Sequence, residues 1–259
     1  GEPAREARDD GSGRMSTIVN AEMGALGADR SGRLHRSSAE ATALHETGFF
    51  RDREMFEALR EIVLPRLIAE RAGQRRLRIW CAGVATGQEA YSVAMLLREH
   101  FAAALSGWDV TIVATDLAGE AVEYARRGRY RRAEVNRGLP ARMLVRYFVR
   151  DEEEWEIAPE LRSICEFREA DVCVPTAGLE AFDLVMMRNV LLFLPMQERT
   201  AALTAAHRSM APHGLLALGQ AEQAEDSTDL FEAEYVQGCC FYRAVAKGPK
   251  GNALSVAWA

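Results

Sequence analysis

Short apolar runs, each followed by a turn and a stretch with helical spacing, form the strongest pattern in the chain. Residues 78–82 are the first run and residues 110–114 the second. Between them, apolar side chains recur at helical spacing, at Tyr91, Val93, Ala94, Leu96 and Leu97. A strand, a helix and a second strand in this order predict parallel pairing with a right-handed crossover, and therefore an α/β fold.

The same alternation continues toward the C-terminus. Residues 118–126 predict a helix that ends at Gly128, because glycine often terminates helices. The later elements that we expect are a strand over residues 182–187, a helix over 197–210, a Pro212-His213-Gly214 turn, a strand over 215–218, and an antiparallel pair at Tyr235 and 240–246. The sheet is therefore expected to be mostly parallel.

The two ends of the chain differ from this pattern. Residues 1–43 are polar, with too few apolar side chains for a core, so we expect a tail there. Residues 56–67 have helical spacing, in a helix that Pro65 is expected to kink or split. We expect the folded domain to cover residues 44–249, with a C-terminal tail over residues 250–259.

One internal segment interrupts the alternation of strands and helices. Residues 130–167 contain a basic stretch, a short amphipathic helix near residues 140–148 and an acidic turn at residues 151–154. This mixture predicts a small inserted β-subdomain outside the main sheet.

Composition narrows the class of protein. A formal net charge of -6 argues against broad binding to nucleic acid, and no apolar stretch approaches the roughly 20 residues that span a bilayer. The five cysteines lack the paired spacings of a zinc site, so we expect no metal. Free thiols are typical of a reducing environment, and we therefore expect a cytoplasmic protein.

A glycine-bearing turn follows the first strand and is the strongest candidate for a ligand site. Gly83 and Gly87 allow a sharp bend and a close approach of the backbone to a ligand, just before a helix begins. The next strand ends at Asp116, where a carboxylate can accept hydrogen bonds from ribose hydroxyls. Together these features predict an adenosine site, although glycine can also serve strand-to-helix packing and Asp116 can also cap a helix.

The residues of the turn restrict the class of ligand. It lacks the Gly-Lys-Ser/Thr ending of a phosphate loop and the three-glycine dinucleotide pattern. Glu89, at the start of the helix, would repel a pyrophosphate but suits a cationic ligand. S-adenosylmethionine, with its α-ammonium and sulfonium groups, therefore fits better than NAD.

Further polar residues follow other strands. Asp171 is either a turn residue or a carboxylate placed to meet an adenine amino group, and Arg188-Asn189 either caps a helix or joins the same site. The carboxyl ends of parallel strands meet at one edge of a sheet, which favours a shared site. We expect Phe49 and Phe50 to pack in the core, whereas Arg51 needs an anionic partner.

These segments resemble the CheR-type chemotaxis receptor methyltransferases, and the resemblance runs over residues 47–243. The motifs that carry it are Glu46-Thr47-Gly48-Phe49-Phe50-Arg51-Asp52, Gly87-Gln88-Glu89-Ala90-Tyr91-Ser92, Ala114-Thr115-Asp116 and Arg188-Asn189-Val190-Leu191. The resemblance implies a Rossmann-like, doubly wound class I fold that methylates glutamate side chains of chemoreceptors with S-adenosylmethionine, leaving S-adenosylhomocysteine. It implies cofactor contacts from Thr47, Arg51, Glu89, Asp116, Asp171, Val172, Arg188 and Asn189, in addition to Gly83 of the turn.

The resemblance also sets expectations for catalysis and partners. A glutamate carboxylate is ionised at neutral pH, so no general base is needed, and Arg51 is the candidate that orients the acceptor or closes over the cofactor. The inserted subdomain would dock receptors, including membrane-bound ones. The acidic turn at residues 151–154 lacks the glycine-bearing loop associated with receptor tethering, and we expect none.

Two departures from the family pattern keep alternatives open. A polar tail stands where the family has a basic helical N-terminal domain, which would allow a small-molecule carboxylate as acceptor. Phe193 stands where the family often has a tyrosine, which would allow a non-catalytic module that binds the cofactor and docks.

Overall fold

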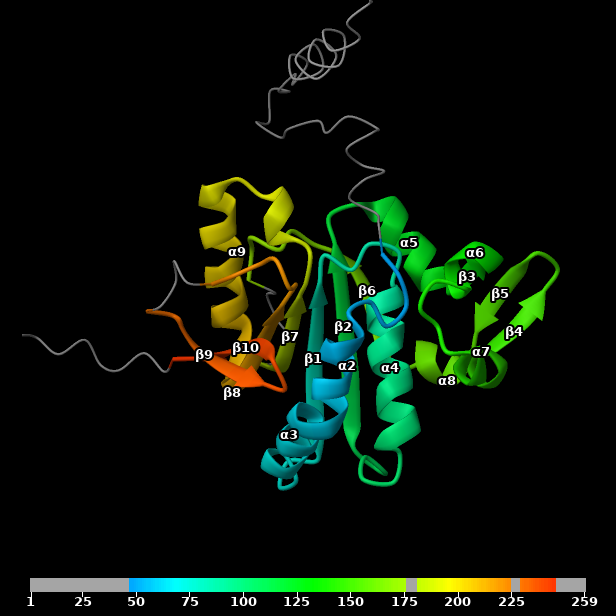
Figure 1. Ribbon diagram of the computed structural model, residues 1–259, viewed down its shortest axis with the longest axis horizontal. Coiled ribbons are helices and arrows are strands. Elements are labelled where there is room, and N and C mark those ends of the chain that lie inside the picture. The colour runs from blue at the N-terminus through cyan, green and yellow to red at the C-terminus, as the bar shows by residue number, and fades with distance from the viewer. Residues whose placement is uncertain (1–46, 176–180, 225–228, 246–259) are drawn as a thin grey trace, which may run out of the picture. The chain divides into compact units, whose positions relative to one another are not determined.

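A seven-stranded sheet in the order β6-β2-β1-β7-β8-β10-β9 forms the centre of the protein (Figure 1). The computed structural model describes residues 47–175, 181–224 and 229–245, so the tails expected over residues 1–43 and 250–259 lie outside the described residues. The strands are β1 (Arg76–Ala82), β2 (Asp109–Asp116), β6 (Cys165–Glu169), β7 (Phe182–Met187), β8 (Met210–Leu218), β9 (Phe231–Val236) and β10 (Cys239–Ala244). The first five pair in parallel, and β10 runs antiparallel to both β8 and β9.

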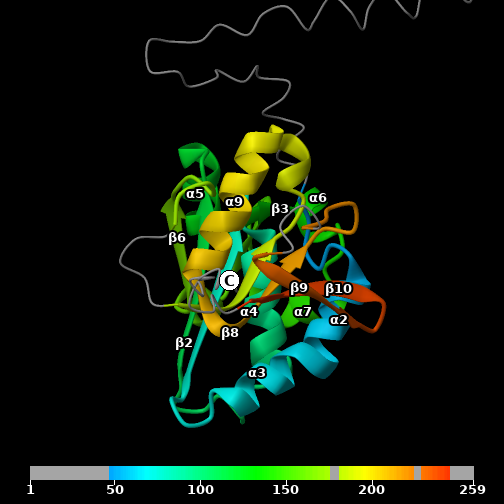
Figure 2. The same cartoon turned by 90° about the vertical axis from the view of Figure 1, so that its left-hand side faces the viewer.

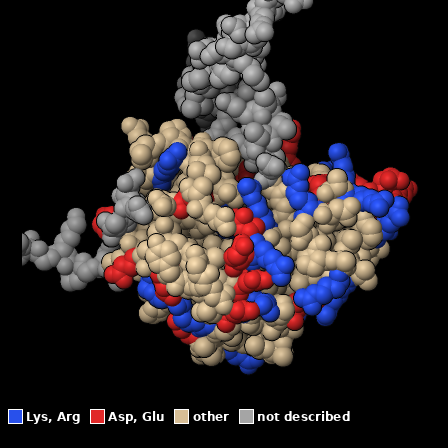
Figure 3. Space-filling model, in the orientation of Figure 1, with Lys and Arg blue, Asp and Glu red and all other residues tan. Residues whose placement is uncertain are grey.

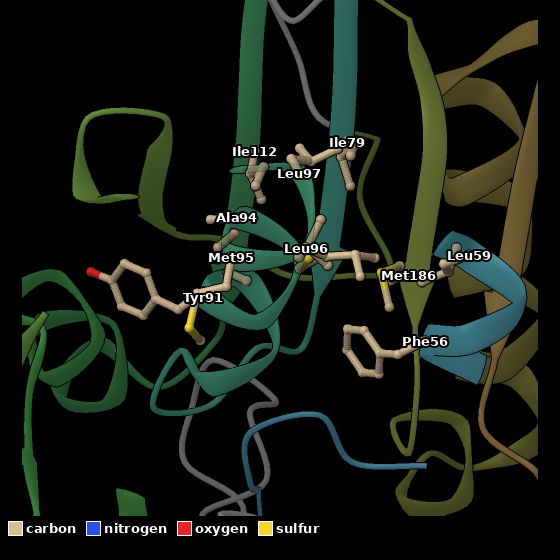
Figure 4. Close-up of a cluster of buried hydrophobic side chains, with 14 of the residues drawn as sticks. Phe56, Leu59, Ile79, Tyr91, Ala94, Met95, Leu96, Leu97, Ile112 and Met186 are labelled. Atoms are coloured by element: carbon tan, nitrogen blue, oxygen red, sulfur yellow. The ribbon is translucent and has the colours of Figure 1, made fainter. Parts of the chain in front are cut away.

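Alternating side chains of β1 build a core on each face of this sheet. Ile79 and Cys81 pack into one cluster, and Trp80 into the other, because successive strand residues point to opposite faces. The helices on the Ile79 face are α2 (Arg53–Ala58), the π-helical turn η1 (Leu59–Val63), α3 (Leu64–Glu70), α4 (Gln88–His100) and α5 (Gly119–Arg127). Figure 4 shows α4 side chains reaching Ile79 and Ile112, and the opposite face is covered by α9 (Met196–Ser209).

The helix expected to split at Pro65 does change geometry there. Pro65 lies in the first turn of α3, directly after the wide π-helical turn η1. Proline has no N–H to donate to the preceding turn, which favours such an irregularity. Figure 2 shows the β9–β10 hairpin beside α2, which contacts β10.

A second, three-stranded sheet in the order β3-β5-β4 lies between α5 and β6 in the chain (Figure 1). Its elements are β3 (Arg129–Arg131), α6 (Arg132–Val135), α7 (Ala141–Tyr147), β4 (Phe148–Asp151), β5 (Glu154–Ile157) and α8 (Pro159–Arg162). The insertion expected over residues 130–167 is therefore too long at its end, because β6 pairs in parallel with β2 in the main sheet. On the face seen in Figure 3, basic side chains are interspersed with acidic ones.

The order of the strands places a topological switch point next to β1. The chain moves outward from β1 to β2 and β6, and then returns to β7 on the other side of β1. Connections leave in opposite directions at this switch point, and open α/β sheets bind ligands in the resulting crevice at the carboxyl ends of the strands. Among the described residues, no helix is long and apolar enough to cross a membrane.

Candidate functional site

The turn after β1 lies tightly between two neighbouring loops. Gly83 and Val84 both donate their backbone N–H to the carbonyl oxygen of Thr115, at 2.8 and 2.9 Å. Gly83 has a φ of +71°, and a Cβ built on it would lie 2.4 Å from Cγ2 of Val190. Glycine is therefore required both by the backbone conformation and by the approach of the loop after β7.

The end of this turn that leads into α4 is fixed by a residue of the three-stranded sheet. Gly87 precedes α4 with a φ of +92°, and a Cβ there would lie 2.7 Å from Cβ of Ala125. The hydroxyl of Tyr130, in β3, donates to the carbonyl oxygen of Thr86 at 2.8 Å. The turn and the first residues of α4 are thus anchored on both sides.

Arg188 lies at the centre of a buried network of charges. Its side chain is only 2% exposed, and Nη1 donates to Oε2 of Glu89 at 2.8 Å. Nη2 donates to the carbonyl oxygen of Arg51 at 2.8 Å and to Oδ2 of Asp52 at 2.5 Å. The guanidinium also lies 5.7 Å from the centre of the Phe56 ring. The network joins three predicted site residues from distant parts of the chain, so Arg188 does not act as a helix cap.

Burial raises the pKa of Glu89, which is the first acidic residue of α4. Arg188 opposes this rise through its charge and its hydrogen bond, whereas the nearby charge of Glu222 adds to it. Arg51 also lies close enough to lower the pKa of Glu89 slightly. The site therefore contains a carboxylate whose ionisation depends on the cations around it.

Asp116 connects the ends of β1 and β2. Its Oδ2 accepts a hydrogen bond from the backbone N–H of Ala85 at 2.7 Å, and its Oδ1 accepts one from Ala118 at 2.9 Å. The N-cap of α5 is Ala118 and no side chain caps that helix, so Asp116 is not the helix cap that the sequence allowed. Its carboxylate forms a local turn with Ala118 and also fixes the glycine turn. A carboxylate has about four acceptor positions, so the two backbone hydrogen bonds leave others for ribose hydroxyls. The contact with ribose remains a prediction.

The remaining predicted residues are more scattered. Asp171 is exposed and accepts the N–H of Cys173 at 2.9 Å, as expected for a turn residue, while Val172 beside it is buried. Asn189 follows β7 with a φ of +58°, and Thr47 is partly buried. No contact in the described part of the chain brings Asp171, Val172 or Thr47 into the Arg188 network.

Three residues that the sequence analysis did not select also lie at this edge. Asp52 pairs with Arg188, and the buried carboxylate of Glu222 accepts backbone N–H groups from the loop after β7. Leu117 is 61% exposed directly after Asp116 and presents an apolar surface there. Asp52 and Leu117 adjoin predicted residues in the sequence, which was the available signal. Glu222 ends the segment Gly219-Gln220-Ala221-Glu222, which stands where the family that the sequence resembles has Gly-His-Ser-Glu, so a signal was available there as well.

Comparison with known proteins decides the family. The model of the CheR methyltransferase, SAM binding domain, matches residues 45–238. The chain belongs to this family. It is 36% identical over 216 residues to chemotaxis protein methyltransferase 1 of Pseudomonas aeruginosa, covering 82% of this chain and 78% of that protein. It is 34% identical to the chemotaxis protein methyltransferase Cher2 of Pseudomonas putida, with the same coverage, and 30% identical to the chemotaxis protein methyltransferase of Vibrio parahaemolyticus, covering 79% and 74%.

The cofactor of this family, S-adenosylmethionine, fits the charges at the site. The carboxylates gathered there are Asp52, Glu89, Asp116 and Glu222. They outnumber the two nearby arginines, so the site favours a ligand with cationic groups. The α-ammonium and sulfonium groups of S-adenosylmethionine have this character, whereas a pyrophosphate would be repelled.

Arg51 and Phe193 are the two predicted residues that bear on catalysis. Arg51 is exposed, its backbone carbonyl accepts a hydrogen bond from Arg188, and its charge lies close enough to Glu89 to lower the pKa of that residue. Phe193 is 44% exposed in the short helix η2 (Leu191–Phe193), and Leu192 beside it is 45% exposed. An apolar surface therefore lies next to the loop that contains Asn189.

The thiol of Cys81, in β1, does not act as a nucleophile at this site. Burial, aided by the charge of Glu89, raises the pKa of Cys81 well above its ordinary value, so this thiol is protonated at neutral pH. The described residues contain no group of side chains that could hold a metal ion. A separate open cleft of about 590 Å³ lies along β6, and its arginines, Arg126, Arg162 and Arg168, are each paired with a glutamate.

Proposed function

We propose that this protein transfers the methyl group of S-adenosylmethionine to glutamate carboxylates of a chemoreceptor or a related signalling protein. The observation that carries the proposal is the Glu89–Arg188–Asp52 network, which joins the glycine turn to the segment that contains Arg51. The names of the relatives, which are chemotaxis protein methyltransferases, support the chemotactic substrate. The product would be a glutamate methyl ester.

The residues at the site match the needs of this reaction. When bound, S-adenosylmethionine supplies a methyl group activated by a positively charged sulfonium. Glu89 and Asp116 provide negative charge at the carboxyl ends of β1 and β2, where we expect the methionine and ribose ends of the cofactor. Leu117 offers an apolar surface on which a flat base can pack.

The acceptor needs orientation more than activation. A glutamate side chain has an unperturbed pKa near ~4.3 and is ionised at neutral pH, so it can attack without a general base. Holding the two reactants in line and excluding water then supplies most of the acceleration. Arg51 is the candidate for this role, because a guanidinium can bind a carboxylate through two parallel hydrogen bonds.

The test is transfer of labelled methyl groups to receptor-containing membranes, with release of the label by base as the signature of an ester. Arg51→Ala should reduce turnover by about tenfold or more, as expected when a positioning contact is lost. Arg53→Ala is a matched control, because Arg53 is two residues away, 86% exposed and paired with Glu57 on its own helix. It should retain wild-type activity.

Three outcomes would contradict parts of the proposal. Equal activity of Arg51→Ala and the wild type would remove Arg51 from catalysis. Base-labile transfer to a small carboxylate but not to receptors would replace the acceptor. Tight binding of S-adenosylhomocysteine without transfer to either acceptor would indicate a non-catalytic module.

A further inference from the structure

The carboxylate of Glu222 is buried and surrounded by backbone N–H groups. Glu222 is only 6% exposed. Oε2 accepts hydrogen bonds from Asn189 and Gly219, both at 2.7 Å. Oε1 accepts them from Val190 at 2.7 Å and from Leu192 at 3.3 Å. The bonds come from the loop after β7 and the end of β8, so a single side chain joins two neighbouring strand ends.

These hydrogen bonds fix the conformation of the loop after β7. The N–H and the C=O of a trans peptide unit point in opposite directions. Because the N–H groups of Asn189 and Val190 point to Glu222, the carbonyl oxygens of Arg188 and Asn189 are turned away from it. Asn189 has a φ of +58°, a left-handed conformation that asparagine adopts more readily than most other non-glycine residues.

The loop leaves little room for an alternative arrangement. A Cβ on Gly219 would lie 2.7 Å from Oε2 of Glu222 and 2.9 Å from Nδ2 of Asn189. On the opposite side, Val190 presses against Gly83 of the glycine turn. Glu222 therefore determines how Val190 meets the turn, although it belongs to neither segment.

Glu222 also acts at a distance through its charge. It lies close enough to Glu89 for its negative charge to raise the pKa of that residue. A ligand with positive charge at the site is thus attracted by Glu222 as well as by Glu89, whereas a neutral ligand gains nothing from it.

We propose that Glu222 is a positioning residue for the cofactor, which shapes the wall formed by Val190 and Gly83 and adds to the negative charge of the site. The proposal rests on the binding of S-adenosylmethionine by this family and not on the identity of the methyl acceptor. A failure to methylate receptors would therefore leave it unaffected.

The test compares Glu222→Gln with the wild type by calorimetric titration of S-adenosylhomocysteine and S-adenosylmethionine. The amide keeps one acceptor oxygen and places an NH₂ group against the N–H groups that faced the other oxygen. Affinity for S-adenosylhomocysteine should fall by about tenfold or more. Affinity for S-adenosylmethionine should fall further, because the sulfonium carries a positive charge that the product lacks.

Asp183→Asn is the matched control for loss of stability alone. Asp183 is also a buried carboxylate, 3% exposed, and accepts the N–H of Arg78 at 2.9 Å, near the other end of β7. This variant should unfold at a lower temperature and bind both ligands with wild-type affinity. All titrations are made well below the unfolding temperature of each variant.

Two results would overturn the proposal. One is that Glu222→Gln binds both ligands as the wild type does and only loses stability, as Asp183→Asn does. The other is an equal loss of affinity for the two ligands, which would refute the contribution of charge. If Glu222→Gln does not fold, Glu222→Asp decides: it keeps the charge, so it should weaken both ligands equally, and unchanged affinity would refute the positioning role.

Discussion

Replacing Arg188 by methionine tests whether the buried charge network has the energetics that its geometry implies. The side chain is 2% exposed, and its partners Glu89 and Asp52 are 14% and 24% exposed, so water screens their charges poorly. Removing one partner of a buried ion pair typically costs about 3–5 kcal/mol, because the remaining charge is left without compensation. Methionine fills a similar volume, which limits the contribution of a cavity.

This free energy corresponds to a large shift in the midpoint of thermal unfolding. At about 2–4 °C for each kcal/mol in a protein of this size, the midpoint of Arg188→Met should fall by about 6–20 °C. Arg53→Met is the control, since Arg53 is 86% exposed and paired with a residue on its own helix. It should change the free energy of unfolding by about 0.5 kcal/mol or less.

The dependence on pH gives a sharper test. In the wild type, burial raises the pKa of Glu89 and Arg188 opposes the rise, so the variant should have a still higher pKa for Glu89 in its folded state. A carboxyl group whose pKa is higher in the folded state stabilises the fold below its unfolded-state pKa, and this contribution is lost as the pH rises through the folded-state pKa. The difference in stability between the wild type and Arg188→Met should therefore narrow as the pH falls from about 7.5 to about 5.

The assay is differential scanning calorimetry at low salt, with the double variant Arg188→Met/Glu89→Gln included. Removing the charge of Glu89 as well should restore about 0.5–3 kcal/mol, the usual range of coupling between residues in contact. A midpoint for Arg188→Met within the range of Arg53→Met, or a stability difference independent of pH, would refute this account of the network.

Other predictions concern the residues that support the site. Gly83→Ala should cost about 1–3 kcal/mol and weaken cofactor binding, because the φ of +71° and the contact with Val190 both oppose a Cβ; wild-type affinity in a titration would contradict this. Thr115→Val should cost about 1–3 kcal/mol by urea unfolding, because it removes the acceptor for the buried indole N–H of Trp80 at 2.9 Å; an unchanged midpoint would show that the indole finds another acceptor. Tyr130→Phe should cost about 1 kcal/mol, because its hydroxyl fixes the glycine turn.

The central strands and the glycine turn could be predicted from the sequence because their signals are local. The run that forms β1 is apolar and ends in glycine, and Gly128 terminates α5 with a φ of +63°, as expected. The strand β6 was partly assigned to the insertion because it is an edge strand. Only Phe167 within it is buried, so it lacks the continuous apolar pattern of the central strands.

The partners of the charged residues could not be predicted in the same way. Arg188 and Asp52 are 136 positions apart, and only the fold reveals that they pair. The role of Glu222 is harder still to foresee, because its partners are backbone N–H groups, which every residue except proline possesses. The sequence identifies which residues can carry charge, and the topology decides which of them meet.

Burying a carboxylate is costly, and this explains why a cation, Arg188, lies inside a site that binds a cationic ligand. Glu89 lies where burial favours its neutral form, and a neutral carboxyl group would offer little to a sulfonium or an ammonium. Arg188 opposes that neutralisation, while Asp52 offsets much of the charge that Arg188 brings. Glu222, whose two oxygens accept hydrogen bonds from backbone N–H groups, adds negative charge to the site. Arg188 therefore favours the ionised form of Glu89, while Asp52 and Glu222 keep the site rich in negative charge.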